Sequence, residues 1–429
     1  MVKIIRSSDG SDIEFFNRIR SRGESTDRKV TAIVGDIISD VRENGDSAVK
    51  KYTSQFDCAE PACYRVPDEW LDDALNKCDK EFLSSLEKAA ENIRAFHKNQ
   101  LPHGFEMKDE NGSLLGQIVR ALECVGIYVP GGTAAYPSSV LMNAIPAKIA
   151  GVEKIIMVTP PPKDGSLNYD ILAAAKVAGV DEVFLCGGAQ AVAALAFGTD
   201  EIQKADKIVG PGNIFVATAK KLLFGIVDID MIAGPSEILI VADRSANAKY
   251  LAADMMSQAE HDRLASAILI TTDEKLANDT LSELERQSAA LSRKDIIDES
   301  LENYGAIIVC DDVDYALRLA DKFAPEHLEL CVEDPMAALK KIKNAGSVFL
   351  GNNSPEPLGD YFAGPNHVLP TSGTARFFSP LSVDEFIKKM QYINYSEQSL
   401  KAAADDVIRL ANAEGLTAHA NSIIVRKDG

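Results

Sequence analysis

Histidine is scarce in this chain and stands mostly beside other polar residues. There are six histidines in 429 residues, and four have an acid, an amide or a turn residue nearby: Glu260-His261, Pro325-Glu326-His327, Asn366-His367 and Ala418-His419. Because imidazole titrates near neutral pH and is the commonest transition-metal ligand, this distribution indicates an enzyme. His97 and His103 flank an expected helix end and are not expected to take part.

One set of residues has the composition of a metal site. Gln258 and His261 are three residues apart at the end of a helix expected over residues 251–260, so one helix face can present both. Asp360 follows a Pro- and Gly-rich turn, and His419 lies between an expected helix and an expected terminal strand. Two imidazoles, a carboxylate and an amide oxygen suit zinc or a similar divalent ion. The same residues are equally compatible with a helix C-cap at Gln258 and His261 and a turn braced by Asp360.

Glu326 and His327 are adjacent where an expected helix gives way to an expected strand over residues 328–332. Such a pair can divide two proton transfers, one from an alcohol and one from a water molecule. The alternative from the spacing alone is a solvated loop that carries a histidine at a helix end.

Glycine-rich loops follow or precede several expected strands, at residues 130–133, 187–190, 210–213 and 233–237. Small residues let a ligand approach the backbone, and helix N-termini offer free N–H groups to a pyrophosphate. Neither the Gly-x-Gly-x-x-Gly fingerprint nor the phosphate-binding loop motif is present. Most such loops are only tight turns, but four in one region favour a dinucleotide across the carboxyl ends of the strands.

The periodicity of apolar residues predicts a doubly wound α/β protein. Helical patterns cover residues 30–54 and 68–98, and short β-branched runs then alternate with Ala-rich helical stretches. The expected strands are 125–129, 154–159, 182–186 and 207–209, then 238–242, 267–271, 306–309, 328–332 and 347–350. The expected helices between them are 138–151, 168–179, 189–196, 213–224, 247–260, 273–290, 312–323 and 335–343. The tail is expected to form helices over 383–390 and 396–413 and a strand over 422–426.

Composition narrows the class of protein. A length of 429 residues with 46% hydrophobic residues fits two main domains, and a net charge of −19 argues against nucleic acid or an anionic membrane as partner. The seven cysteines are scattered and mostly apolar in context, which is typical of reduced thiols. No apolar run has the length of a membrane span, and the N-terminus lacks a signal-peptide core. The prediction is a cytoplasmic enzyme.

Nine segments, in order along the chain, together resemble the histidinol dehydrogenase family. They begin at Val125 (VGIYVPGG), Ala135 (AYPSSVLMN), Cys186 (CGGAQ), Val209 (VGPGN), Ile232 (IAGPSE), Ser257 (SQAEH), Phe323 (FAPEHLE), Gly364 (GPNHVLP) and Glu414 (EGLTAH). The likeness extends over essentially the whole chain.

The resemblance implies oxidation of L-histidinol to L-histidine through an aldehyde, with two NAD and one zinc ion per site. Matching motif positions implies four zinc ligands, two proton acceptors, three NAD contacts and further substrate contacts. The ligands are Gln258, His261, Asp360 and His419; the acceptors are Glu326 and His327; the NAD contacts are Tyr128, Gln190 and Asn213. The substrate contacts are Ser236, His367 and Glu414, together with Gln258, His261, His327, Asp360 and His419.

The resemblance also implies two incomplete Rossmann-like domains with helical N- and C-terminal extensions. The expected division is 1–25 as an extension, 26–124 plus 237–380 as the larger domain, 125–236 as an inserted domain, and 381–429 as a segment exchanged in a homodimer. Glu414 and His419 would then act across the dimer interface.

Two departures from the family pattern touch no implied role: Arg263 stands where proline is common, and Phe378 where serine is usual. One alternative is a related enzyme of the same family that oxidises another small polar alcohol, such as a sulfonated diol. Another is a metabolite sensor that has lost catalysis. His367, Glu414 and His419 favour histidinol, and the complete Glu326–His327 and ligand sets disfavour a sensor.

Overall fold

The computed structural model describes residues 2–21, 28–57, 61–131 and 136–427. The chain forms two compact units, and each is described by itself. The main unit comprises Met1–Gln100 and Glu123–Phe386, and the small unit comprises Leu101–Leu122 and Ile387–Gly429. Among the described residues, no helix combines the length and apolar character needed to cross a membrane.

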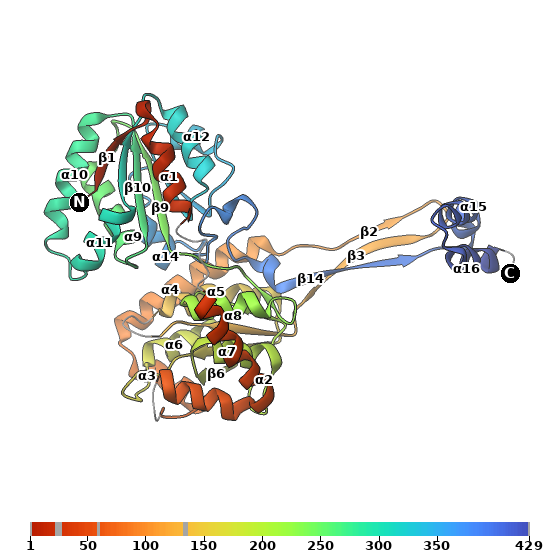
Figure 1. The fold of residues 1–429 in the computed structure, drawn as a ribbon. Helices are drawn as coiled ribbons and strands as arrows, with labels where there is room; N and C mark the ends of the chain where they lie inside the picture. The colour runs from red at the N-terminus through yellow and green to blue at the C-terminus, as the bar shows by residue number, and fades with distance from the viewer. Residues whose placement is uncertain (1, 22–27, 58–60, 132–135, 428–429) are drawn as a thin grey trace. The chain divides into compact units, whose positions relative to one another are not determined.

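The main unit contains a six-stranded, fully parallel sheet (Figure 1). Its strands, in order across the sheet, are β1 (Lys3–Arg6), β11 (Ala306–Val309), β10 (Ser266–Thr271), β9 (Glu237–Ala242), β12 (His327–Cys331) and β13 (Ser347–Leu350). Its helices are α1 (Ser11–Ser21), α9 (Ala248–Ala259), α10 (Glu274–Ser288), α11 (Lys294–Tyr304), α12 (Val313–Phe323), α13 (Pro335–Leu339) and α14 (Glu356–Tyr361).

Helices cover both faces of this sheet because alternate strand residues point to opposite sides. In β9, Ile238 and Ile240 pack in one apolar cluster with α9, α10 and α11. Leu239 and Val241 pack in another with α1, α12 and α13. The sheet is therefore a buried central layer, which holds the ends of β9 and β12 in fixed register.

The main unit also contains a five-stranded parallel sheet, ordered β6-β5-β4-β7-β8. Its strands are β4 (Cys124–Tyr128), β5 (Lys154–Thr159), β6 (Glu182–Leu185), β7 (Lys207–Val209) and β8 (Asp228–Ile229). Its helices are α2 (Arg28–Phe56), α3 (Asp68–Lys77), α4 (Lys80–His97), α5 (Pro137–Ala150), α6 (Tyr169–Ala178), α7 (Gly188–Phe197) and α8 (Ile214–Leu223). The helices α2, α7 and α8 share one apolar cluster with this sheet, and α3 and α4 pack against α6 and α5.

The small unit contains an antiparallel sheet and two helices. Its elements are β2 (Phe105–Lys108), β3 (Leu114–Ala121), β14 (Ile387–Asn394), α15 (Glu397–Ala413) and α16 (Thr417–Lys427). β3 is the central strand and pairs with both β2 and β14. The main unit also has short 3-10 helices at Ser7–Asp9, Lys98–Gln100, Thr374–Arg376 and Val383–Phe386.

All the strands and helices expected between residues 125 and 350 are present, and their ends differ from the expected ones by at most four residues. The doubly wound class is confirmed. The helix expected over 383–390 is wrong, because β14 pairs along its whole length with β3, more than 260 residues away. The strand expected over 422–426 is also wrong, since this segment belongs to α16, which packs on α15. Pairing or packing with a distant segment decides the structure in both places.

The N-terminal region also contains features that periodicity alone did not predict. β1 joins the edge of the six-stranded sheet by parallel pairing with β11. The helical pattern over 68–98 is divided into α3 and α4 at Asp79, whose side chain caps α4 by accepting from Phe82 N (2.8 Å). The six described cysteines are free thiols.

Candidate functional site

His327 is the first residue of β12 and lies beside the first residues of β9 in the parallel register. The residue is 4% exposed. Its Nδ1 donates to the carbonyl oxygen of Glu237 (3.1 Å), because a carbonyl can only accept. This bond fixes the ring and directs Nε2 away from the backbone. Nε2 is buried and has no hydrogen-bond partner among the described residues, so it is available to a ligand.

Glu326 lies next to this histidine and is anchored by the neighbouring strand. Its Oε2 accepts from Glu237 N (2.8 Å) and lies 3.8 Å from His327 Nδ1. Burial raises the pKa of Glu326 to about 7, although His327 and the Glu237 N–H oppose the shift. A carboxyl with such a pKa can hold or release a proton at neutral pH.

The pKa of His327 responds to its acidic surroundings. Burial alone would lower this pKa, but the carboxylates of Glu326, Asp360 and Glu356 outweigh it and raise the pKa to about 10. The Nε2 atom lies 3.8 Å from Asp360 Oδ1 and 4.0 Å from Glu356 Oε1. A cation held by the same carboxylates would lower the pKa again, since it competes with the imidazolium for their charge.

His261, Glu356 and Asp360 form a group that can hold a metal ion. Each offers one ligand atom, and these atoms lie within 4.8 Å of one another. Burial lowers the pKa of His261, which favours the neutral imidazole that a metal requires. Burial opposes ionisation of Asp360, but His327 and His367 hold its pKa well below its usual range. The set of donors fits zinc or another borderline divalent ion.

Gln258 adds a further observation that fits a bound ion. It lies in the last turn of α9, three residues before His261, and is 1% exposed. Its Oε1 has no hydrogen-bond partner among the described residues, which is costly for a buried amide unless a ligand pairs with it. His261 N also donates to the Gln258 carbonyl oxygen (3.3 Å), so the C-cap alternative holds for the backbone while both side chains stay available.

Glu356 was not found by the sequence analysis. It lies four residues before Asp360 on the short helix α14, so one helix face carries both carboxylates. Burial and the charge of Asp360 raise the pKa of Glu356 to about 8. Ser257 Oγ donates to Glu356 Oε2 (3.2 Å). The backbone N–H of Glu356 donates to Oε1 of the buried Glu329 (3.0 Å). The four-residue spacing in Glu356-Pro-Leu-Gly-Asp360 was the available signal.

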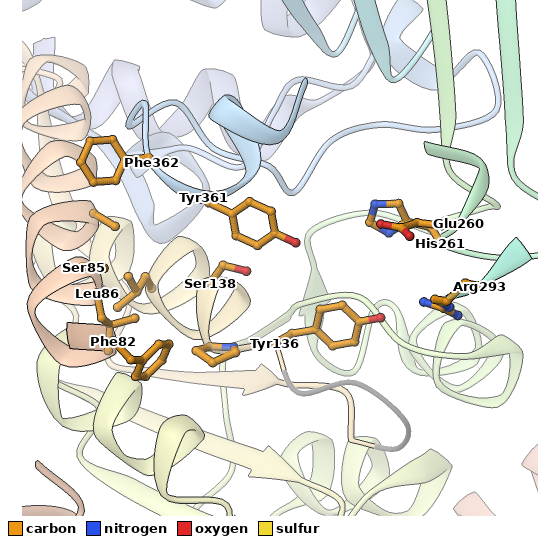
Figure 2. A pocket seen from close by; sticks show the side chains of 13 residues that line it. Phe82, Ser85, Leu86, Tyr136, Ser138, Glu260, His261, Arg293, Tyr361 and Phe362 are labelled. Atoms are coloured by element: carbon orange, nitrogen blue, oxygen red, sulfur yellow. The ribbon is translucent and has the colours of Figure 1, made fainter. Parts of the chain in front are cut away.

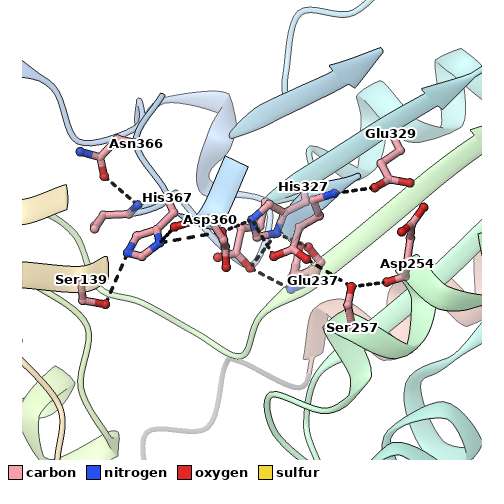
Figure 3. A network of polar contacts seen from close by, with 12 residues as sticks. Ser139, Glu237, Asp254, Ser257, His327, Glu329, Asp360, Asn366 and His367 are labelled. Carbon is pink, nitrogen blue, oxygen red and sulfur yellow. Dashed lines mark hydrogen bonds and ion pairs between the residues drawn. The ribbon is translucent and has the colours of Figure 1, made fainter. Parts of the chain in front are cut away.

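His367 joins this cluster to the N-terminal turn of α5 (Figure 3). Its Nδ1 donates to the Asp360 carbonyl oxygen (3.0 Å), and its Nε2 lies 3.4 Å from Ser139 Oγ. Burial lowers the pKa of His367, which favours the neutral ring. Ser139 lies within the first turn of α5, the helix that comes after β4 of the five-stranded sheet. The polar cluster therefore extends to this helix.

Two cavities meet this cluster. One has a volume of about 280 Å³ and is lined by His327, Asp360 and His367 together with apolar residues such as Phe349 and Leu369. The other has a volume of about 340 Å³ and is lined by His261 and Glu260 on one side (Figure 2). Aromatic and aliphatic side chains line much of the rest: Phe82, Leu86, Tyr136, Leu141, Tyr361 and Phe362. A small polar molecule fits beside the histidines in either space.

The remaining predicted substrate and metal residues are placed as follows. Ser236 directly precedes β9, and its carbonyl oxygen accepts from Ser266 N (3.0 Å). Glu414 is the C-cap of α15 and His419 lies in α16, and both are exposed in the small unit. Their assignment to the site stays a prediction.

The residues predicted to contact a dinucleotide lie at the carboxyl ends of the five-stranded sheet or in the helix turns that follow. Tyr128 ends β4, and its hydroxyl accepts from Gly188 N (3.1 Å). Gln190 is 1% exposed, and neither amide atom has a hydrogen-bond partner among the described residues. Asn213 is exposed and caps α8 by accepting from Phe215 N and Val216 N (3.0 and 3.2 Å). The unpaired amide of Gln190 fits a polar ligand at this edge.

The cluster around Glu326 and His327 has a different position relative to its sheet. Glu237 and His327 begin β9 and β12, so they lie at the amino ends of the six-stranded sheet. This cluster therefore lies at the strand ends opposite to those where ligands of doubly wound sheets usually bind. The reason is local: the loop 324–326 and the end of α9 bring polar side chains to the amino edge.

Buried imidazoles and carboxylates around available ligand atoms, carried by a two-sheet α/β scaffold, define an enzyme. The histidinol dehydrogenase family model matches residues 20–427. Histidinol dehydrogenase of Clostridium acetobutylicum is 54% identical, with 99% of both chains covered. That of Caldanaerobacter subterraneus subsp. tengcongensis is 55% identical, again with 99% of both covered. The crystal structure of histidinol dehydrogenase from Elizabethkingia anophelis is 38% identical and has a TM-score of 0.93, covering 99% of this chain and 98% of that one.

This chain therefore belongs to the histidinol dehydrogenase family, and it is an oxidoreductase. The family resemblance inferred from the nine sequence segments is confirmed.

Proposed function

We propose that this protein oxidises L-histidinol to L-histidine in two consecutive steps, with two NAD and one zinc ion per site, as the last steps of histidine biosynthesis. The observation that carries the proposal is the position of His327 Nε2. This atom is buried and unpaired, and it lies within 4.0 Å of two carboxylates that share a possible metal site with His261. An alcohol bound there would meet a proton acceptor and a metal-binding group together.

The residues Gln258, His261, Asp360 and His419 would hold the zinc, with Glu356 beside them. When bound, zinc would orient the amine and imidazole of the substrate and draw electron density from them. NAD would supply the hydride acceptor. The roles of the protein side chains follow from their own geometry.

His327 would take the hydroxyl proton of the alcohol at Nε2. The Nδ1 bond to the Glu237 carbonyl keeps the other nitrogen protonated, so Nε2 is the basic atom of the neutral ring. In the second step Glu326 would take a proton from the water that adds to the aldehyde. Its anchored Oε2 and its pKa of about 7 suit this role at neutral pH.

His367, Ser236 and Glu414 would bind the polar groups of the substrate, and Tyr128, Gln190 and Asn213 would contact NAD. The burial of His327, Glu326 and His367 limits access of water, which protects an aldehyde held between the two steps.

The test is the number of NADH molecules formed per L-histidinol consumed by the zinc-loaded protein. The expected result is two, because an alcohol is taken to a carboxylic acid. The signal should be lost after exhaustive chelation and in His327→Ala. No turnover by folded, metal-replete protein would contradict the proposal, and a sulfonated diol would then be the next substrate to assay.

We further propose that the protein acts as a homodimer with shared active sites, in which Glu414 and His419 complete the site of the partner subunit. Both side chains are exposed in the small unit. Large apolar side chains are also exposed there, including Met390 (54%), Ile393 (75%) and Leu410 (67%). Apolar groups at this density on a small unit favour burial against another chain.

A mixture of two inactive variants tests this arrangement. His261→Ala and His419→Ala are each expected to be inactive as pure proteins. When both are co-expressed, about a quarter of wild-type activity should return, because half of the dimers are mixed and each has one intact site. Light scattering of the wild type should give twice the chain mass. No recovery in proven mixed dimers would place His419 in the site of its own chain.

A further inference from the structure

The five-stranded sheet has the strand order expected for a dinucleotide site, but its second strand lacks the usual carboxylate. The order β6-β5-β4-β7 corresponds to strands 3-2-1-4 of the doubly wound fold. In that fold a carboxylate near the end of the second strand binds the hydroxyls of the adenosine ribose. Here β5 ends at Thr159 and three prolines follow. The next acid, Asp164, is exposed and bonded to Ser166 Oγ within its own turn (2.7 Å).

Asp57 brings a carboxylate to this edge from elsewhere in the chain. It directly follows α2, and its Oδ2 accepts from Gly187 N (3.2 Å) at the start of α7. A Cβ on Gly187 would lie 2.4 Å from Pro160 Cγ and 3.2 Å from Asp57 Oδ2. The carboxylate and the first residue after β5 therefore meet at one point, where the second-strand acid would otherwise act.

Other groups show that this edge is built for a polar ligand. A Cβ on Gly131, which follows β4, would lie 3.0 Å from the Pro160 carbonyl oxygen, so Gly131 also lies at this edge. The buried amide of Gln190, in the first turn of α7, has no hydrogen-bond partner among the described residues. Its Oε1 lies against Gly188, 2.6 Å from where a Cβ would stand. A buried amide without partners is costly unless a ligand supplies them.

We propose that Asp57 is the specificity-determining residue of the dinucleotide site. Its carboxylate accepts hydrogen bonds from the adenosine ribose hydroxyls of NAD and repels the 2′-phosphate of NADP. The inference rests on the proposed use of NAD. The contact with Gly187 N also permits a purely structural role, in which Asp57 accepts this hydrogen bond and does not touch the dinucleotide.

The test compares kcat/KM for NAD and for NADP, at saturating L-histidinol, in the full-length, zinc-loaded enzyme. Asp57→Asn keeps an oxygen that can accept from Gly187 N and removes the charge, and Asp57→Ser shortens the side chain. In both variants the NAD/NADP ratio of kcat/KM should fall at least about 10-fold, the loss expected for a charged hydrogen bond and a removed repulsion. The ratio does not depend on the active fraction, so partial unfolding cannot imitate this result.

Asp46→Asn is the matched control. Asp46 lies on α2, the helix that Asp57 follows. It also accepts from groups beside the five-stranded sheet, Thr199 Oγ1 (2.6 Å) and Glu201 N (3.1 Å), which follow the opposite end of α7. Its ratio should equal that of the wild type. An unchanged ratio in both Asp57 variants would overturn the inference while leaving the proposed function intact. Failure of the wild type to reduce NAD with histidinol would instead overturn the proposed function.

Discussion

Glu326→Gln is expected to slow the oxidation of histidinal by about 10²- to 10⁴-fold, the range for loss of a general base. The amide keeps an oxygen that can accept from Glu237 N, so the strand contact at 2.8 Å can survive. The oxidation of histidinol to histidinal should be affected less, since in the proposed mechanism His327 takes the proton in that step. Single-turnover measurements with each substrate separate the two steps.

The pH dependence gives this prediction a second readout. Burial raises the pKa of Glu326 to about 7, and only the ionised carboxylate can act as a base. In the wild type, the rate of histidinal oxidation should therefore rise with pH and level off above about 7. Glu326→Gln should remove this inflection. An inflection that persists unchanged would assign it to another group.

The contribution of Glu326 to folding stability should fall as the pH rises, whereas the rate of histidinal oxidation should increase. The pKa of Glu326 is raised from 4.5 in the unfolded chain to about 7 in the folded protein. The folded state therefore binds the proton more tightly, so its stability relative to Glu326→Gln falls as the pH rises through this window. Glu333→Gln, an exposed carboxylate just beyond the other end of β12, should change neither rate nor stability. Urea unfolding at pH 4 and pH 8 measures the difference.

The two sheets place polar residues at opposite kinds of strand end. In the five-stranded sheet, Tyr128 and the loop before Gln190 follow the carboxyl ends of strands, as expected for a doubly wound fold. In the six-stranded sheet, Glu237 and His327 begin their strands. A hydride transfer between two ligands requires two facing surfaces. His367, bonded to Asp360 of α14 and close to Ser139 of α5, links a helix that follows the six-stranded sheet's β13 to one that follows the five-stranded sheet's β4. The position of Glu237 and His327 at the amino ends of their strands is consistent with a site that has two facing surfaces.

Local patterns predicted much of the fold because its parallel strands are buried on both faces. β4, for example, is buried throughout and reads in the sequence as a continuous apolar run. β14 could not be predicted in this way. Its partner β3 lies more than 260 residues away, and the charged and apolar residues of β14 are equally compatible with a helix turn. β1 has the same limitation, because it is four residues long and, among the described residues, pairs with β11 alone.

The candidate site could be predicted where its residues are neighbours in the sequence, and less well where they meet only in the folded protein. Glu326 and His327 are adjacent in the chain, and their buried, anchored geometry removes the alternative of a solvated loop. Glu356 and Asp57 were missed because each acquires its meaning from a distant contact. Glu356 meets His261, and Asp57 meets Gly187, across the fold. A carboxylate that ends a helix or follows a proline is otherwise indistinguishable from a surface residue.

Asp360→Asn is expected to lower the zinc content from one ion per chain to a small fraction and to abolish turnover. Asp360 contributes one of the clustered ligand atoms, and its carboxylate also faces His327 Nε2 at 3.8 Å. Loss of its charge would remove a proposed zinc ligand and one of the carboxylates that face His327 Nε2. Zinc content is measured by elemental analysis, and the rise in melting temperature on adding zinc, which follows from binding to the folded state, should disappear.

Glu356→Gln is the matched variant, and it distinguishes the two carboxylates of α14. If Asp360 is the ligand and Glu356 supports it, Glu356→Gln should weaken zinc binding by only about 10- to 100-fold, as for outer-shell partners of metal ligands. Excess zinc should then restore the rise in melting temperature in Glu356→Gln but not in Asp360→Asn. The reverse order of effects would make Glu356 the ligand, in agreement with its place beside His261 but against the role implied by the family resemblance. Either order is informative because the two residues lie on one helix and both face His327 Nε2, so the comparison shows which of the two carboxylates matters more for zinc binding.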